Sequence, residues 1–530
     1  MAVRLWGALV ALAIVLVVAA SWPLVQVMDT HLLGRLGDPD LGAGIWWSHS
    51  FVDCVLELRN PFFRPELAWP EGQDVRLLLW NVGAQVLLFP VHALLDPVPA
   101  LNAAVLVVGV ANGVACGWAG WRLTRDPWGA AAAVVVGTAS AYAIWESGVG
   151  RTEQGLWAPL AVWLGGMLWL RDGGGKKAVL VAGIGLGVTG SCYWFYAWFG
   201  VLFTLLLAAW WRKPSALGVL GVSLVVVLPS LALIAPAFFE EGNHYALLMN
   251  RLEPLAQKNA GALEVPGAFL LQLTTEPARK VPILLVPAVL GAMVFRPLRI
   301  PAAIAASAVI FALGPVLVGS RGFPLMWGDL SFALPAALMD WLPGHERFWW
   351  PYRWLGLGLP AFAICVAGLV ARARRFRPVA VAALAIVCVA DARVGLRNDR
   401  PVEHVWIESN IPEMPELHGP ILVWPLARVP NDLIGYQVIH GQPQGGGIAW
   451  DMSPAMRGAE WERRLVELGV FVALEEARRN RPITGDWSET AGFRYVLATR
   501  PGLRQHLGEP LWTDRGMSLF ALPSDAEASP

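Results

Sequence analysis

Long apolar segments recur along most of this chain. A transmembrane helix needs about 20 consecutive, mainly apolar residues. Eleven runs approach that length, each bounded by charged residues, proline or glycine. The pattern therefore predicts an α-helical polytopic membrane protein with about eleven transmembrane helices. The predicted spans are residues 5–27, 102–121, 128–145, 155–170, 177–193, 195–211, 215–235, 281–295, 300–318, 350–371 and 378–392.

Two apolar stretches differ from an ordinary transmembrane helix. The first run resembles a signal peptide, but it is longer than the roughly 7–15 apolar residues of such peptides, which favours an uncleaved helix. The segment Leu77–Leu95 is apolar enough to span, yet it contains Asn81, Pro90 and His92. We predict that it is an interfacial or re-entrant helix within a long first outer loop, residues 28–101.

The pattern changes near the C-terminus. Short apolar runs at residues 421–427, 492–499 and 516–523 predict strands, and residues 457–479 have a helical pattern. We therefore expect a transmembrane domain over residues 1–392, followed by a small α/β domain over residues 393–530.

The distribution of charge predicts the orientation. With the N-terminus on the cytoplasmic side, thirteen basic residues and only Asp126 and Asp172 as acids fall in the inner loops. An excess of Lys and Arg is typical of cytoplasmic loops. An odd number of spans then places the C-terminal domain outside. The basic residues are Arg122, Arg125, Arg171, Lys176, Lys177, Arg212, Lys213, Arg296, Arg299, Arg372, Arg374, Arg375 and Arg377.

Composition supports the membrane assignment. Of the 530 residues, 56% are hydrophobic and only 15% are charged, against about 25% charged in soluble domains. The formal net charge is zero, so charge gives no argument for a nucleic-acid partner. The five cysteines have no CxxC spacing, which favours small buried residues over a disulfide framework or a zinc site.

Three aspartates follow the first helix: Asp29, Asp38 and Asp40. The sequence Asp38-Pro39-Asp40 directly follows Gly37, and this composition is typical of a solvent-exposed turn. Two carboxylates separated by one residue can also share a cation, or act as a base and a positioning group. The spacing alone leaves both interpretations open.

The outer connection at residues 146–154 combines Glu146, Arg151 and Glu153. Glu153 would stabilise the first turn of the following helix in a purely structural role. The same short connection is held at the membrane surface, where Arg151 would suit an anionic phosphate. Both interpretations, helix capping and phosphate binding, remain open.

Two arginines flank the start of the tenth predicted span. Arg347 precedes it, and Arg353 lies about one turn into the apolar segment. Arg353 either extends to the interface or pairs with a buried group or a lipid phosphate.

Two other groups, His244 with Tyr245 in the outer loop 236–280 and His440 in the tail, have ordinary loop surroundings. If they belong to a site, they would contact an acceptor or form a lid.

The order of these motifs resembles the GT-C superfamily of multi-spanning glycosyltransferases, which use polyprenyl-phosphate-linked sugars. Within it, the chain is similar to a bacterial branch with a Gly-Asp-Pro element after the first helix. The resemblance covers nearly the whole chain. The motifs are GDPDLGAGIWWSHSF (37–51), NPFFRPELAWPEG (60–72), GRTEQGLWAPL (150–160), ERFWWPYRW (346–354) and PLARVPNDLIGYQVIHGQPQGGGIA (425–449).

The resemblance implies roles for the acidic residues. In that superfamily an aspartate of the first outer loop acts as base or positions the acceptor, which makes Asp38 the first candidate and Asp40 the second. The same two residues would hold a divalent cation, Mg²⁺ or Mn²⁺. The acidic position of the second outer loop falls on Glu146 or Glu153, where relatives often have Asp or His.

The resemblance also implies the remaining partners. Arg151, Arg347 and Arg353 are candidates for binding the donor phosphate. The donor would be a polyprenyl-phosphate-linked sugar, and the acceptor a glycan, lipid or protein outside the cytoplasm, at a bacterial inner membrane. Two alternatives remain: a transporter or flippase for a lipid-linked glycan, and a non-catalytic protein of envelope biogenesis.

Overall fold

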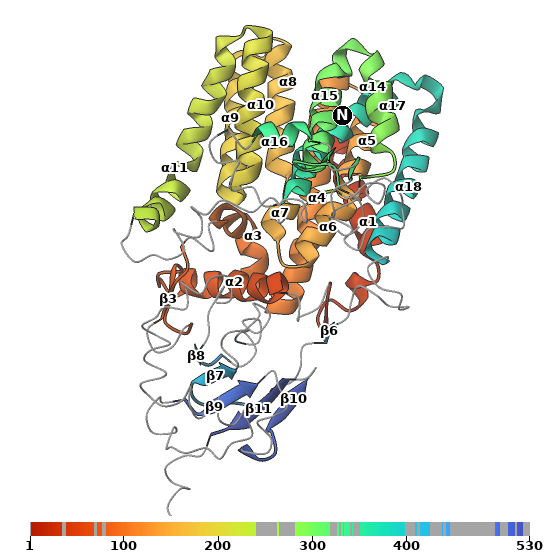
Figure 1. Ribbon diagram of the computed structural model, residues 1–530. Coiled ribbons are helices and arrows are strands. Elements are labelled where there is room, and N and C mark those ends of the chain that lie inside the picture. The colour runs from red at the N-terminus through yellow and green to blue at the C-terminus, as the bar shows by residue number, and fades with distance from the viewer. Residues whose placement is uncertain are drawn as a thin grey trace, which may run out of the picture.

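The computed structural model of the chain (Figure 1) consists of a helical bundle and a small sheet. It describes residues 2–33, 39–67, 72–76, 81–239, 262–263, 281–318, 326–327, 330–331, 333–339, 342, 350–397, 409–410, 414–424, 437, 441–445, 493–498, 507–514 and 517–522.

Each of the eleven predicted apolar runs contains helix in the structure, and the third run is divided into two helices. The helices are α1 (Ala2–Ser21), α4 (Pro97–Thr124), α5 (Pro127–Thr138), α6 (Ala141–Gly148), α8 (Ala158–Arg171), α9 (Gly175–Cys192), α10 (Trp194–Trp211), α11 (Leu217–Phe239), α14 (Leu285–Val294), α15 (Arg299–Ala312), α17 (Leu355–Arg372) and α18 (Arg377–Arg397).

Six described segments are long and apolar enough to cross a membrane. The protein is therefore a multi-pass membrane protein, as its hydrophobic pattern predicts. Helix α14 falls short, since its ten residues span only about 15 Å of a hydrocarbon core about 30 Å thick. The number eleven remains a prediction. The six segments are Val3–Ser21, Pro97–Thr124, Pro127–Gly148, Trp194–Trp211, Pro214–Pro236 and Pro351–Arg372.

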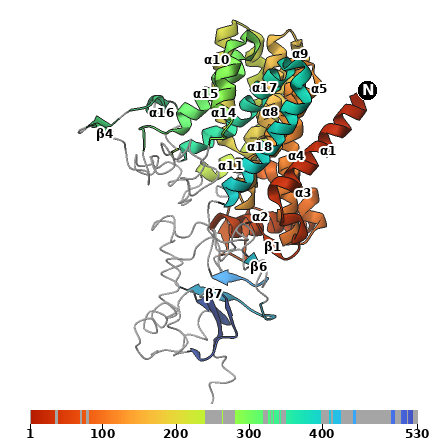
Figure 2. The same cartoon turned by 90° about the vertical axis from the view of Figure 1, so that its right-hand side faces the viewer.

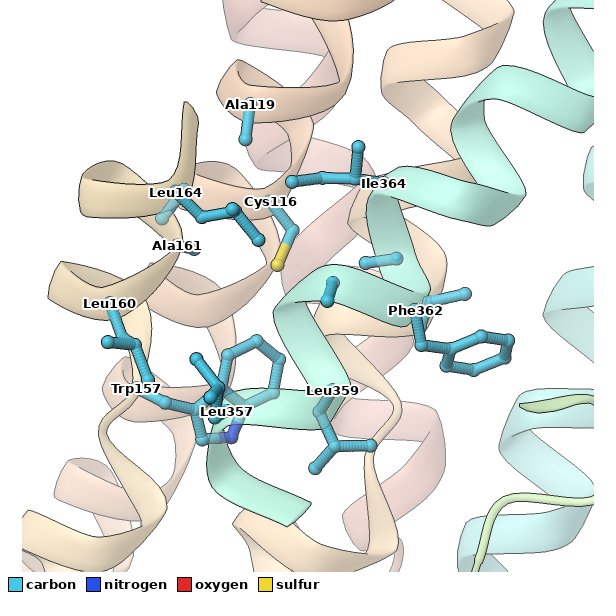
Figure 3. Packing of buried hydrophobic residues seen from close by; sticks show 14 of the residues in the cluster. Cys116, Ala119, Trp157, Leu160, Ala161, Leu164, Leu357, Leu359, Phe362 and Ile364 are labelled. Atoms are coloured by element: carbon cyan, nitrogen blue, oxygen red, sulfur yellow. The ribbon is translucent and has the colours of Figure 1, made fainter. Parts of the chain in front are cut away.

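The bundle core is packed closely around small side chains. Figure 3 shows Cys116 and Ala119 of α4 between Leu164 of α8 and Ile364 of α17, and all four side chains are buried. Small residues let helix backbones approach closely where no hydrophobic effect drives helices together. All five cysteines are free, and four of them are buried.

A helix that crosses the end of the bundle differs from the expected turn. Helix α2 (Pro39–Leu56) lies across the bundle axis in Figure 1. It begins at Pro39, so Asp40 occupies the first helical turn and not a solvent-exposed turn. Proline favours this outcome, because its fixed φ suits the first position of a helix.

Helix α3 (Val82–Leu94) forms the described part of the segment Leu77–Leu95. Its thirteen residues extend only about 20 Å, and it packs against α2, α4 and α9. A helix of this length packed on the bundle agrees with a non-spanning role.

His92 in α3 is buried, and its Nε2 has no hydrogen-bond partner among the described residues. Burial, together with the nearby His49, lowers the pKa of His92 to about 4. The unfolded chain, with an ordinary histidine pKa near 6.5, therefore takes up a proton first as the pH falls. Folding stability is lost as the pH drops from about 6.5 towards 4.

We predict that lowering the pH from 7 to 5 reduces the free energy of unfolding by about 2 kcal/mol through His92. Thermal unfolding of the purified protein should show that loss reduced in His92→Leu and unchanged in His418→Leu, since His418 is exposed. Equal acid sensitivity of the wild type and His92→Leu would contradict it.

The C-terminal residues form a five-stranded sheet of order β10-β11-β9-β7-β8. Strand β7 (Ile421–Trp424) pairs in parallel with β9 (Tyr495–Ala498) and with β8 (Gln444–Gly445), while β11 (Met517–Ala521) pairs antiparallel with β9 and with β10 (Trp512–Asp514). The three predicted strands are thus found. The helix predicted over residues 457–479 lies outside the described residues.

The sheet and the start of α1 lie at opposite ends of the molecule, as Figure 2 shows. Strand β1 (His31–Leu32), just after the first helix, pairs with β6 (Ser409–Asn410). Asn102 of α4 holds the same segment, because its Nδ2 donates to the carbonyl oxygens of Met28 and His31. The segment that follows α1 is thereby fixed to both the bundle and the C-terminal region.

Candidate functional site

A break in the helical pattern builds the centre of the candidate site. Helix α6 ends at Gly148, α7 (Thr152–Gly155) forms a single turn, and α8 starts at Ala158. Asn112 of α4, which is fully buried, satisfies the interrupted backbone. Its Nδ2 donates to the Gly155 carbonyl at 2.8 Å, and its Oδ1 accepts from the Trp157 amide at 3.1 Å. Interrupted helix backbone inside a transmembrane bundle is stable only where its free amide and carbonyl groups are hydrogen-bonded.

Arg151 links two carboxylates across this break. Its Nε lies 2.7 Å from Oε2 of Glu146, and its Nη1 lies 3.0 Å from Oδ2 of Asp40. The side chain of Glu146 is 0% exposed, whereas those of Arg151 and Asp40 are 21% and 49% exposed. The group therefore extends from a buried carboxylate, through a guanidinium, to a carboxylate that reaches solvent.

Two glycines allow this arrangement. The first turns of α2 pass so close to the α6–α7 connection that a Cβ atom on Gly44 would lie 2.7 Å from the Cα of Gly150. Gly150 also has a φ of +86°, and a Cβ there would lie 2.7 Å from the Cα of Leu41. Only glycine combines that backbone angle with that approach, and the approach brings Asp40 to Arg151.

Tyrosines surround the inner end of the group. The Tyr352 hydroxyl donates to Oε1 of Glu146 at 2.9 Å. Next to it, the hydroxyls of Tyr142 and Tyr196 are hydrogen-bonded at 2.6 Å, and Tyr196 donates to the carbonyl of Gln154 at 2.9 Å. All three tyrosines are buried. These contacts fix Glu146 and the backbone of α7, so Arg151 is held from two sides.

Arg353 adds a second guanidinium at the start of the apolar segment Pro351–Arg372. It lies over the rings of Tyr193 and Trp350, at 5.6 and 6.0 Å from the ring centroids. Its Nε is buried and donates to no described hydrogen-bond partner, and Glu146 and Arg151 are close enough to act on it electrostatically. Arg353 thus belongs to the same polar cluster, in addition to lying on aromatic rings.

Glu153 lies in the single turn α7 and not in the first turn of the following span, which begins as α8 at Ala158. It is buried, and burial raises the pKa of its carboxyl group, an effect partly offset by hydrogen bonding with Asn81 and Gln154 and by Arg151. Glu153 therefore keeps a proton more readily than an exposed glutamate. Its hydrogen-bond partners Asn81 and Gln154 differ from the Tyr352 partner of Glu146, although Arg151 acts on both carboxylates.

The structure thus brings together four of the candidate residues: Asp40, Glu146, Arg151 and Arg353. The sequence gave no role to Tyr142, Tyr196 or Asn112, although polar side chains within apolar runs were a usable signal. The candidates that lie outside the described residues are Asp38, Arg347, His244, Tyr245 and His440.

The described residues do not favour a metal site. No three of their His, Cys, Asp and Glu side chains come together to hold a metal ion. The carboxylate of Asp40 is paired with Arg151, which competes with a cation for the same oxygen atoms.

Comparison with known proteins finds a likeness of fold among solved structures. No family model and no curated protein sequence matches the chain. The crystal structure of ArnT from Cupriavidus metallidurans bound to undecaprenyl phosphate is 16% identical, with 98% of each chain covered and a TM-score of 0.50. This chain has the GT-C fold. The predicted fold class, a GT-C-like helical membrane protein with a small C-terminal sheet, is confirmed.

Two structures of the oligosaccharyltransferase AglB from Archaeoglobus fulgidus are more distant. One, in complex with an inhibitory peptide and a dolichol-phosphate, is 12% identical, with a TM-score of 0.44 and coverage of 93% of this chain and 69% of that chain. The other, in complex with Zn and sulfate, is 13% identical, with a TM-score of 0.45 and coverage of 92% and 67%. At these identities the GT-C likeness concerns the fold alone.

Proposed function

We propose that the protein is a membrane glycosyltransferase, which transfers a sugar from a polyprenyl-phosphate donor to an acceptor outside the cytoplasm. The observation that carries the proposal is the cluster of Asp40, Arg151, Glu146 and Arg353 at one end of a GT-C bundle. ArnT, which shares that fold, was solved with undecaprenyl phosphate.

The two arginines suit the donor phosphate. In this proposal the polyprenyl chain remains in the bilayer, and its phosphate binds beside Arg151 and Arg353 at the end of the bundle. Arginine presents several donors in a planar arrangement that matches phosphate oxygens. When the sugar leaves, negative charge grows on the phosphate, and fixed cations stabilise that charge.

Asp40 suits the acceptor. Its carboxylate is half-exposed and lies at the N-terminus of α2, where the helix dipole favours negative charge. In the proposed step, the acceptor hydroxyl transfers its proton to the carboxylate and its oxygen bonds to the anomeric carbon. The bond from that carbon to the phosphate oxygen breaks, and the electron pair leaves with the polyprenyl phosphate.

Glu146 is proposed as a positioning residue. It is fully buried and paired with Arg151 and Tyr352, so it holds the guanidinium and does not reach a substrate. From the sequence, Asp38 remains the first candidate for the base. If Asp38 takes the proton, Asp40 serves to orient Arg151.

Asp40→Asn tests the proposal. Transfer from a polyprenyl-phosphate sugar, measured with the purified protein in lipid nanodiscs, should fall at least tenfold, because an amide neither accepts the proton nor pairs fully with Arg151. Asp74→Asn is the matched control, since Asp74 pairs with Arg76 in the same outer region but away from the site. Undiminished transfer by Asp40→Asn, alone and combined with Asp38→Asn, would rule out a role in transfer for these two aspartates of the first outer loop.

A further inference from the structure

A polar cavity lies beside α2, away from the Arg151 cluster. Its volume is about 450 Å³, within the range of roughly 300–1,000 Å³ typical of small-molecule sites. One wall is α2, another is the segment that carries β2 (Phe63–Arg64), and the third comes from the C-terminal region. The polar side chains that line it include His49, Asp53, Arg59, Arg64, Glu66 and Gln437.

The cavity and the candidate catalytic carboxylate share one helix. His49 and Asp53 follow Asp40 by two and a half to nearly four helical turns, which at 1.5 Å per residue is about 14–20 Å. This separation is too large for one sugar ring to contact both places. It suits an extended molecule whose reacting end lies at Asp40 while a more distant part occupies the cavity.

The charges around the cavity are balanced. Arg64 forms an ion pair with Glu66, and Nε of Arg59 lies 2.5 Å from Oε2 of Glu57. Nε2 of His49 lies 3.4 Å from Oδ2 of Asp53. A site for an anion would show an excess of cations, and a site for a cation an excess of carboxylates. Balanced donors and acceptors instead match a neutral molecule with many hydroxyl groups, each of which both donates and accepts.

The wall behind these groups is rigid. Arg64 is buried, its Nη1 donates to the Ser50 carbonyl and contacts Sγ of Cys54, and its guanidinium lies 5.1 Å from the ring centroid of Trp46. In contrast, the side chains of His49 and Asp53 are 35% and 42% exposed. The cavity therefore combines a fixed floor with accessible hydrogen-bonding groups, the arrangement of a preformed polar site.

We propose that this cavity binds a neutral carbohydrate, as the distant part of an acceptor glycan, with His49 and Asp53 hydrogen-bonding its hydroxyl groups. The assignment as acceptor rests on the proposed transferase function. The binding itself does not, because it requires neither donor nor transfer.

The test uses the full chain in lipid nanodiscs and a printed array of neutral, acidic and amino-containing oligosaccharides. Neutral members should be retained preferentially, and His49→Phe and Asp53→Asn should each weaken retention at least tenfold. His418→Phe is the matched control, because His418 lies 3.8 Å from Glu416 in an exposed pair outside the cavity. Thermal unfolding confirms that each variant is folded.

Asp40→Asn separates the two proposals, since it should retain carbohydrate binding while losing transfer. If the wild type binds carbohydrate but shows no transfer, the transferase proposal fails. The cavity then stands as a carbohydrate site without the acceptor assignment. A preference for acidic members, the absence of retention on the whole array, or unchanged retention by His49→Phe would overturn the carbohydrate site.

Discussion

Replacing Arg151 by methionine is expected to lower the free energy of unfolding by about 3–5 kcal/mol, the usual effect of removing one partner of a buried ion pair. Glu146 is 0% exposed and would lose its cationic partner 2.7 Å away. The Tyr352 hydroxyl would remain its described hydrogen-bond donor. Asp40 would lose its partner too, so transfer should also be abolished. Chemical or thermal unfolding in detergent measures the first effect.

Two matched variants separate burial from charge. Arg171 is 20% exposed and pairs with Asp172 at 2.7 Å, but Asp172 is 50% exposed, so Arg171→Met should cost less than about 1 kcal/mol. The double variant Glu146→Gln with Arg151→Met should recover much of the lost stability without recovering transfer. If Arg151→Met and Arg171→Met destabilise the protein equally, the account of a buried pair is wrong.

Gly44→Ala is expected to remove activity and to destabilise the protein by roughly 3 kcal/mol, the upper end of the cost of overpacking. The new Cβ atom would lie 2.7 Å from the Cα of Gly150 and closer still to the Gly150 carbonyl oxygen. Backbone cannot rotate away as a flexible side chain can, so α2 must move. Because Asp40 lies one turn earlier, its contact with Arg151 should then break.

The control for this prediction is Gly221→Ala in α11, where no atom lies within 4 Å of the added Cβ. Alanine is favoured over glycine in a helix by about 1 kcal/mol, so the control should be neutral or stabilising. The same helix preference acts at Gly44, which means that any loss there comes from the contact with Gly150. Full transfer activity in Gly44→Ala would show that the close approach is not needed.

The sequence predicted the elements that a membrane itself imposes. An apolar run of bilayer length has few alternatives to a helix, so the eleven runs all contain helix. Helix α2 was missed, because a helix lying across the bundle end needs no apolar run of that length. Its start at Pro39 was interpreted as a turn, since Gly, Asp and Pro favour both structures.

The contacts within the site could not be predicted from local patterns. Asp40 and Arg151 are 111 residues apart, and Glu146 and Tyr352 are 206 residues apart. Such pairs are determined by how the helices pack, which hydrophobic spacing does not specify. The resemblance selected Glu146 and Arg151 as site residues but gave no basis for recognising Glu146 as the buried partner of Arg151.

The most direct test of the proposed function is the binding of undecaprenyl phosphate compared with that of the uncharged alcohol undecaprenol, measured by native mass spectrometry on the purified protein. We expect the phosphate to bind at least tenfold more tightly, and Arg353→Gln to remove that preference while the fold is retained. Equal binding of the two lipids by the wild type, or an unchanged preference in Arg353→Gln, would contradict a phosphate site at this end of the bundle.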